Sequence, residues 1–225
     1  MNPCAPNFGE VIRMIPRNAL EAAQLFLEPA LAQAGCVVDA TAGNGHDVLF
    51  LCRRTRPDCR VWAFDIQSAA IGACDALLKN QGVRDRVQLI QADHRALTDY
   101  VREPVHAAVF NLGYLPGQDH SVTTNPESLE PALDGLLGLL APAGRISIVA
   151  YPGHEPGRQE YDFLESYLST LPQTRFSITR LSFINQKNNP AILYSIGKTG
   201  RNHHEDTPPD PSEGNRGSTR HQNPG

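Results

Sequence analysis

Two acidic residues, each at the end of an apolar run, mark the part of the chain best suited to bind a ligand. The first run ends at Asp39 and leads into a loop of small residues that contains Gly43 and Gly45. The second run ends at Asp65, twenty residues after Gly45. In parallel α/β sheets such a loop closes around a nucleotide-like ligand, and an acid at this offset accepts hydrogen bonds from ribose hydroxyls. The spacing therefore predicts a site for a cofactor that contains adenosine.

The loop departs from the dinucleotide-binding pattern in two ways. Val48 stands where a dinucleotide fold has its third glycine or an alanine. Asp47 falls in the first turn of the expected helix, where a carboxylate repels a pyrophosphate and suits a cation. The loop therefore favours S-adenosylmethionine, which carries a sulfonium and an ammonium group, over NAD. An ordinary glycine-rich turn that binds nothing is the remaining alternative.

A second group of chemically useful residues follows the apolar run 105–111. The segment Asn111-Leu112-Gly113-Tyr114 resembles the Asn-Pro-Pro-Tyr signature of amino-group methyltransferases, with Leu-Gly in place of Pro-Pro. In that signature the Asn carbonyl accepts a hydrogen bond from the target nitrogen, and the Tyr ring stacks on the substrate. We therefore expect Asn111 and Tyr114 to be catalytic. The alternative is that Asn111 stabilises a turn and Tyr114 belongs to the core.

Methylation of an amine requires that the amine be neutral. A primary alkylamine resembles lysine, with a pKa of about 10.4, so holding it neutral at pH 7 costs roughly 4–5 kcal/mol. An apolar pocket offsets part of this cost, because burial disfavours the charged form. Asp119, His120 and His154 lie on loops at the expected site and are candidate proton acceptors. Loss of the proton directly to water is the alternative.

The pattern of apolar runs predicts the elements that position these residues. Strands are expected at 36–40, 61–65, 87–91, 105–111, 145–151, 176–183 and 191–197. Helices are expected at 19–34, 46–54, 67–80, 94–101, 127–140 and 158–170, with Asn18 capping the first and Pro29 bending it. Strands that alternate with helices imply a parallel sheet covered on both faces, and the last two strands suit an antiparallel hairpin. The expected fold is α/β, a Rossmann-like class I methyltransferase with a seven-stranded, mostly parallel sheet.

Ligands of open α/β sheets bind beyond the carboxyl ends of the strands. Asp65 is expected to bind ribose there, and Ile66 or Gln67 to lie against the adenine face. Asp93, after the third strand, can accept a hydrogen bond from the adenine amino group, with His94 beside it. The alternative for Asp93 and His94 is simple capping of the following helix.

Composition bounds the remaining expectations. The chain has 225 residues and a net charge of −4, which fits one domain over 1–199, with an irregular segment at 1–17, and a disordered polar tail at 200–225. Its five cysteines are odd in number and contain no Cys-x-x-Cys, which favours reduced thiols in the cytoplasm and argues against a metal site. No apolar run is long enough to cross a membrane, and no secretory signal is evident.

An acidic chain needs a local basic patch to meet a nucleic acid. The best candidate for such a patch is the cluster Arg53, Arg54, Arg56 and Arg60. The alternative is that these arginines form a solvated helix end and loop.

Four motifs that occur in order resemble those of the bacterial family labelled "putative rRNA methylase". They are Asp39 to Asp47, Asn111 to Gly117, Tyr151-Pro152-Gly153-His154 and Asn185-Gln186-Lys187-Asn188-Asn189-Pro190, and the resemblance covers roughly residues 35–198. Characterised members of the family methylate the aminomethyl group of 5-aminomethyl-2-thiouridine at the tRNA wobble position. The resemblance implies a class I fold, S-adenosylmethionine as donor, a tRNA anticodon loop as substrate and a homodimer.

The resemblance also implies roles for individual residues. Donor binding is expected at Asp39, Thr41, Gly43, Asn44, Gly45, His46, Asp47, Asp65, Gln67, Asp93, His94 and Asn111. Catalytic roles near the substrate are expected for Asn111, Tyr114, Asp119 and His154. Substrate binding is expected at Tyr114, Pro116 and Gly117, with Asn185, Lys187 and Asn188 as RNA contacts. The alternative for these asparagines is that they merely tolerate turn conformations. The lengthened N-terminal segment and the unusual tail depart from the family but touch none of the motifs.

Two other functions remain open at this level. Because the chain carries a net negative charge, one alternative is methyl transfer to rRNA or to a small amine instead of tRNA. A protein of another class, which binds S-adenosylmethionine without turnover and acts as an RNA scaffold, would keep the donor loop but not depend on Asn111.

Overall fold

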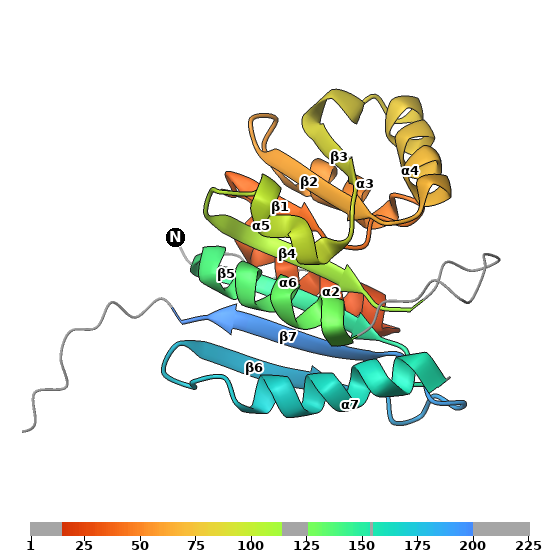
Figure 1. The fold of residues 1–225 in the computed structure, drawn as a ribbon, viewed down its shortest axis with the longest axis vertical. Helices are drawn as coiled ribbons and strands as arrows, with labels where there is room; N and C mark the ends of the chain where they lie inside the picture. The colour runs from red at the N-terminus through yellow and green to blue at the C-terminus, as the bar shows by residue number, and fades with distance from the viewer. Residues whose placement is uncertain (1–14, 114–125, 154, 200–225) are drawn as a thin grey trace, which may run out of the picture.

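The computed structural model describes residues 15–113, 126–153 and 155–199, and within them one seven-stranded sheet organises the chain (Figure 1). The strands are β1 Cys36–Asp39, β2 Arg60–Asp65, β3 Val87–Gln91, β4 Val105–Asn111, β5 Leu140–Ala150, β6 Phe176–Leu181 and β7 Ile192–Lys198. Their order is β3-β2-β1-β4-β5-β7-β6. The first five strands are parallel, and β7 is antiparallel to both β5 and β6. The fold expected from the sequence is confirmed.

The helices also follow the expected pattern, with small differences at their ends. The α-helices are α2 Ala19–Leu31, α3 His46–Arg54, α4 Ser68–Asn80, α5 Leu97–Tyr100, α6 Pro126–Leu139 and α7 Glu155–Ser169. Two short 3₁₀ turns, Arg84–Arg86 and His94–Ala96, precede β3 and α5. Helix α2 starts as expected, because the Asn18 side chain accepts a hydrogen bond from the Glu21 N–H, but it ends at Leu31 rather than Ala34.

Strand β5 starts five residues earlier than expected. Leu140 pairs with Val105, and the pairing then shifts so that Arg145 lies opposite Ala107. Ala143, in the intervening segment, has a φ of 59°. Pro142 and Gly144 lie in this segment, which forms an irregularity within the strand.

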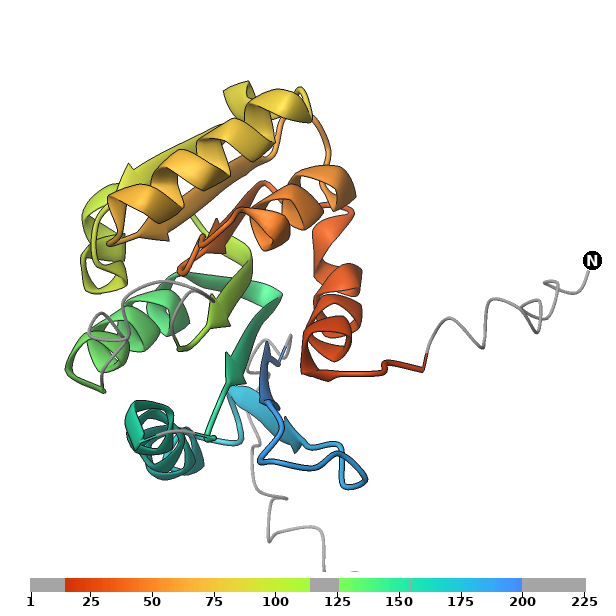
Figure 2. The ribbon, with the colours of Figure 1, turned by 90° about the vertical axis from the view of Figure 1, so that its right-hand side faces the viewer.

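Alternating side chains of the strands fill two separate apolar layers. Val37 and Val109 point into the layer formed with α2, α3 and α4, and Val38 and Phe110 point into the layer formed with α6 and α7. Viewed along the sheet, α2 and α3 lie on one side and α6 and α7 on the other (Figure 2). This burial on both faces explains why the central strands read as continuous apolar runs.

The order of the strands reverses at β1, which lies between β2 and β4. Asp39, the last residue of β1, is aligned with Ala63 of β2 and with Val109 of β4. The chain therefore leaves β1 at the centre of the carboxyl edge, between the ends of β2 and β4. This is where an open α/β sheet forms its ligand crevice.

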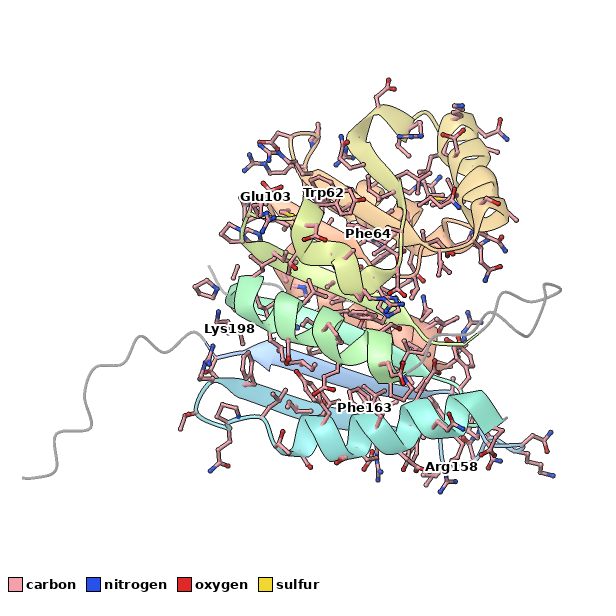
Figure 3. The ribbon with its side chains drawn as sticks, in the orientation of Figure 1. Trp62, Phe64, Glu103, Arg158, Phe163 and Lys198 are labelled. Atoms are coloured by element: carbon pink, nitrogen blue, oxygen red, sulfur yellow. The ribbon has the colours of Figure 1, made fainter. Side chains whose placement is uncertain are left out.

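The arginine cluster lies at the opposite, amino edge of the sheet. Arg54 ends α3, and Arg60 begins β2 and pairs with Glu103 at 2.9 Å. Figure 3 shows Glu103 and Lys198 at this end of the molecule and Arg158 at the other. Arg54 and Arg56 also have acidic partners, Glu28 and Asp58. The cluster therefore lies away from the carboxyl edge, and its ion pairs with acids fit the alternative of a solvated helix end and loop.

Gly45 is the position at which the loop after β1 most requires glycine. Its φ is +85°, and a Cβ there would lie 2.8 Å from Cys74 Sγ and 3.1 Å from Cys74 Cα, on α4. We expect Gly45→Ala to lower the free energy of unfolding by about 2–4 kcal/mol, from the left-handed backbone and the steric overlap together. Urea denaturation measures this change.

Gly72→Ala, also on α4, is the matched control, because nothing lies within 4 Å of a Cβ at Gly72. It should be neutral or slightly stabilising, since alanine favours helix over glycine. Equal stability of the Gly45 and Gly72 variants would contradict the packing described for the loop.

Candidate functional site

The loop after β1 is held by hydrogen bonds to all three central strands. The buried Asp39 accepts through Oδ1 from the Thr41 N–H at 3.0 Å. Thr41 Oγ1 in turn accepts from the backbone N–H of Asn111, on β4, at 2.7 Å. Gly43 N–H donates to Asp65 Oδ2, on β2, at 2.9 Å. The loop is therefore preformed, with its shape fixed by the ends of its neighbouring strands.

Asp65 lies at the end of β2 with its carboxylate fixed by two backbone donors. Besides the bond from Gly43, its Oδ1 accepts from the Gln67 N–H at 2.9 Å. A carboxylate has about four acceptor positions, so each oxygen can accept one more hydrogen bond. The half-buried side chain thus presents fixed acceptors beside the glycine loop, which is the arrangement that ribose hydroxyls require.

Asn111 is oriented by a chain of side-chain hydrogen bonds. Its Nδ2 donates to Asp47 Oδ2 at 2.6 Å, and Gln24 Nε2 donates to Asp47 Oδ1 at 3.2 Å. Because a carboxylate only accepts, the NH₂ of Asn111 must face Asp47 and its carbonyl must face away. The Oδ1 of Asn111 is buried and has no hydrogen-bond partner among the described residues. The site therefore contains a fixed, unpartnered acceptor.

Gln24 is a residue of this site that the sequence analysis missed. It lies on α2, which packs against the sheet and α3, between Ala23 and an apolar stretch. A polar residue within the apolar run of an amphipathic helix was the available signal. The sequence alone does not say which carboxylate it would meet.

Three carboxylates, Asp39, Asp47 and Asp65, gather at this edge. Burial raises the pKa of Asp39 well above its usual value, and the nearby charges of Asp47 and then Asp65 add to the rise, against the Thr41 N–H bond. Among the described residues, no lysine or arginine makes an ion pair or hydrogen bond with any of the three. This environment fits a positively charged ligand and opposes a pyrophosphate.

The raised pKa of Asp39 has a consequence for stability. An acid with a higher pKa in the folded state ionises first in the unfolded state, so stability falls as pH rises above the usual carboxyl range. Asn in its place keeps an acceptor for the Thr41 N–H without the charge. We expect Asp39→Asn to leave stability unchanged at pH 4 and to raise it at pH 8, as measured by urea denaturation at both values. The prediction would be contradicted if the free energy of unfolding of Asp39→Asn, compared with that of the parent, were lower at pH 8 than at pH 4.

Asp93 and His94 are placed mainly by local structure. Asp93 Oδ1 accepts from the Arg95 N–H at 2.9 Å, and Oδ2 pairs with the Arg95 guanidinium at 2.8 Å. The buried His94 has its Nε2 3.2 Å from Ser128 Oγ, and its ring packs edge-on against Phe110. Burial lowers the pKa of His94, which favours a neutral ring. These contacts match the capping alternative for Asp93, and they make His94 part of the wall between β4 and α6.

The other expected donor-binding residues lie around the same edge. Asn44, in the loop after β1, and His46, which follows that loop at the start of α3, are exposed. The half-buried Gln67 precedes α4. Tyr151 follows β5 and lies beside the Asn111 segment, since a Cβ at Gly113 would be 3.6 Å from its Cδ2. Burial, and then the charge of Asp47, raise the pKa of Tyr151. Tyr151 belongs to one of the four sequence motifs, but the sequence alone predicts no role for it.

The expected RNA contacts Asn185, Lys187 and Asn188 are exposed on the loop between β6 and β7, at the carboxyl edge of β5. Asn188 has a φ of 63°, so the turn alternative accounts for the asparagine there. Tyr114, Pro116, Gly117, Asp119, His120 and His154 lie outside the described residues.

No helix in the described part of the chain is long and apolar enough to cross a membrane.

Comparisons with known proteins agree on the family. The family model described as "Putative rRNA methylase" matches residues 61–197. The chain is 32% identical over 189 residues to the chloroplastic tRNA (mnm(5)s(2)U34)-methyltransferase of Arabidopsis thaliana, a match that covers 79% of this chain and 69% of that protein.

Solved structures support the same assignment. A "putative rRNA-methylase" from Clostridium thermocellum is 38% identical, with a TM-score of 0.79 over 82% of this chain and 99% of that one. A "putative methyltransferase" from Streptococcus mutans, solved in complex with SAH, is 33% identical, with a TM-score of 0.75 over the same shares. Together with the preformed loop and the cation-suited edge, these matches show that the chain belongs to the "Putative rRNA methylase" family and is a methyltransferase with a Rossmann-like fold.

Proposed function

We propose that the protein methylates the amine of 5-aminomethyl-2-thiouridine at the wobble position of tRNA. The methyl donor is S-adenosylmethionine, which supplies an electrophilic methyl group on a positively charged sulfur. The relative from Arabidopsis thaliana is a methyltransferase for the corresponding tRNA position. The product would be 5-methylaminomethyl-2-thiouridine.

The observation that carries this proposal is the Oδ1 of Asn111, which has no partner in the described part of the chain. A buried acceptor without a partner costs free energy, so its retention suggests a ligand donor. An amine N–H can supply that donor, and accepting it would turn the nitrogen lone pair in a fixed direction. Asp47 and Gln24 prevent the amide from turning its NH₂ toward the substrate instead. Such positioning can account for several kcal/mol of rate acceleration.

The donor would be held by the chain's own carboxylates and backbone. We assign the ribose to Asp65, and the cationic part to the edge formed by Asp39 and Asp47. The segment from Thr41 to Gly45 supplies a close-fitting backbone, since Gly45 lacks the Cβ that would push α4 away. Asn44, His46, Gln67, Asp93 and His94 complete the proposed donor site.

The substrate side of the proposal rests on residues outside the described part of the chain. Tyr114, with Pro116 and Gly117, would stack on the base, and Asp119 or His154 would accept the proton that the amine releases. A tRNA substrate also suggests a cytoplasmic location for this chain, although the relative from Arabidopsis thaliana is chloroplastic. The four described cysteines, all free and buried, suit a reducing compartment.

The test is transfer of label from S-adenosylmethionine to defined acceptors. The purified protein should label tRNA that carries 5-aminomethyl-2-thiouridine, and nucleoside analysis should find the label at the wobble position. Transcript tRNA without the aminomethyl group is the matched control and should stay unlabelled. Label in rRNA or in a free amine, but not in the modified tRNA, would overturn the proposal.

A further inference from the structure

A cleft of about 380 Å³ lies beside the site, between the end of β5, the start of α7 and the loop that joins β6 to β7. This volume is within the range of sites for small organic ligands. Its lining includes Pro152, Arg158, Tyr161, Ile184, Gln186 and Pro190. None of these residues belongs to the donor site described above.

The lining combines a flat aromatic surface with a cation and apolar walls. The Arg158 guanidinium lies over the Tyr161 ring, with its Cζ 5.5 Å from the ring centroid. Ile184 is 97% exposed, which is unusual for a large apolar side chain. Gln186 adds an amide able to donate and accept hydrogen bonds. Aromatic and guanidinium planes, apolar edges and a few polar groups are the chemistry that proteins use for unpaired nucleobases.

The cleft is continuous with the carboxyl edge of the sheet. Pro152 directly follows Tyr151, whose ring lies near Gly113 in the Asn111 segment. The loop packs against this turn, because a Cβ at Gly153 would lie 3.6 Å from the Asn189 carbonyl oxygen. Gln186 Nε2 also donates to the Arg17 carbonyl at 2.9 Å, which ties the loop to the start of α2.

The charges at the cleft suit an RNA backbone although the chain as a whole is acidic. Arg158 is at the cleft itself, exposed and paired with Asp162 across the surface of α7. Lys187 is exposed on the same loop as Ile184 and Gln186. Figure 3 shows Arg158 at the opposite end of the molecule from Glu103 and Lys198. Positive charge is therefore available on the side where the proposed substrate would arrive.

We propose that this cleft binds an unpaired nucleotide that neighbours the methylated uridine in the anticodon loop. The inference rests on the proposed function for the identity of the RNA. It goes further by assigning Arg158, Tyr161 and Ile184 to a second nucleotide. The base lies against the Arg158 and Tyr161 planes, Ile184 covers it, and Lys187 lies near its phosphate.

Kinetics with an anticodon stem-loop RNA that carries the aminomethyl group test this assignment. Arg158→Ala and Ile184→Ala should each raise KM for the RNA by about tenfold, the size of one lost base-stacking contact, with a smaller effect on kcat and none on KM for the donor. Arg175→Ala is the matched control, because Arg175 also lies over a ring, that of Phe176 at 5.2 Å, but at the opposite end of β6. It should leave KM for the RNA unchanged.

Cross-linking separates this inference from the proposed function. The stem-loop, with 4-thiouridine on either side of the wobble position, should cross-link to peptides within 152–163 or 182–192. Active parent protein with unchanged KM in both variants, or cross-links confined to other peptides, would overturn the cleft assignment alone. Absence of transfer by the parent, with cross-links still in these peptides, would overturn the proposed function alone. A changed oligomeric state of Ile184→Ala by light scattering, with normal RNA binding, would instead assign Ile184 to a contact between copies.

Discussion

Replacing Asn111 with alanine should lower kcat for methyl transfer by about 100- to 1,000-fold, while the affinity for S-adenosylmethionine changes by less than about threefold. A loss of this size follows when a fixed hydrogen-bond partner of the reacting group is removed. Asn111 Oδ1 is buried and has no hydrogen-bond partner among the described residues, so its contribution should arise when the amine is bound. Single-turnover kinetics and donor titration by calorimetry measure the two quantities.

Two further variants locate the effect. Asp47→Asn removes the group that forces the Asn111 amide into one orientation, and it should lower kcat by a smaller factor, about 10-fold. Asn80→Ala, at the exposed end of α4, is the control and should match the parent. Equal losses of turnover and donor affinity in Asn111→Ala would mean that Asn111 holds the donor rather than the amine.

Replacing Asp65 with alanine should weaken donor binding by about 30- to 100-fold, with a smaller effect on kcat at saturating donor. The carboxylate has two roles whose losses add. It offers acceptors to the ribose hydroxyls, and its Oδ2 fixes the Gly43 N–H of the loop. Hydrogen bonds to a charged acceptor contribute about 1.5–3 kcal/mol, which corresponds to this loss of affinity. Calorimetry with S-adenosylmethionine and with its demethylated product measures the change.

Asp58→Ala is a suitable control for Asp65, because Asp58 is an exposed acid that pairs with Arg56 away from the site. Its donor affinity should equal that of the parent. If Asp65→Ala bound the donor normally but turned over slowly, the ribose assignment would have to move to another residue.

The sheet could be predicted from the sequence because its signals are local. Burial of β1, β2 and β4 on both faces gives short, nearly continuous apolar runs, and each run ends in a polar residue at the carboxyl edge. The expected helix at 46–54 agrees with α3 at both ends, where Gly45 precedes it and Thr55 follows it in an extended conformation. The positions of Asp39, Asp65 and Asn111 follow from strand order alone, since parallel strands bring their ends to one edge.

The side-chain network within the site could not be predicted, because it joins residues distant in sequence. Gln24 reaches Asp47 across 23 positions, and Asp47 reaches Asn111 across 64. These contacts depend on how helix α2 packs against the sheet, which the spacing of residues in the sequence does not reveal. The same limit applies to the arginine cluster, which is compact in sequence but faces the amino edge.

The missing third glycine also has a structural explanation. In the sequence, Val48 occupies the position of the third glycine of a dinucleotide fold, which favours another cofactor. In the structure Val48 is fully buried in the layer with α3 and α4. The glycine that allows the loop after β1 to approach a helix closely is instead Gly45, which packs against Cys74 of α4. The choice against a dinucleotide is therefore better supported by the three carboxylates at the edge than by the packing of Val48.

The central claim is that the amine of the tRNA wobble uridine is the group held by Asn111. Nucleoside mass spectrometry of tRNA from host cells that carry Asn111→Ala in place of the parent gene tests it most directly. The account predicts loss of 5-methylaminomethyl-2-thiouridine and accumulation of its precursor, which is lighter by one methyl group, while the Asn80→Ala strain keeps the parent pattern. An unchanged nucleoside profile in the Asn111→Ala strain would contradict the account.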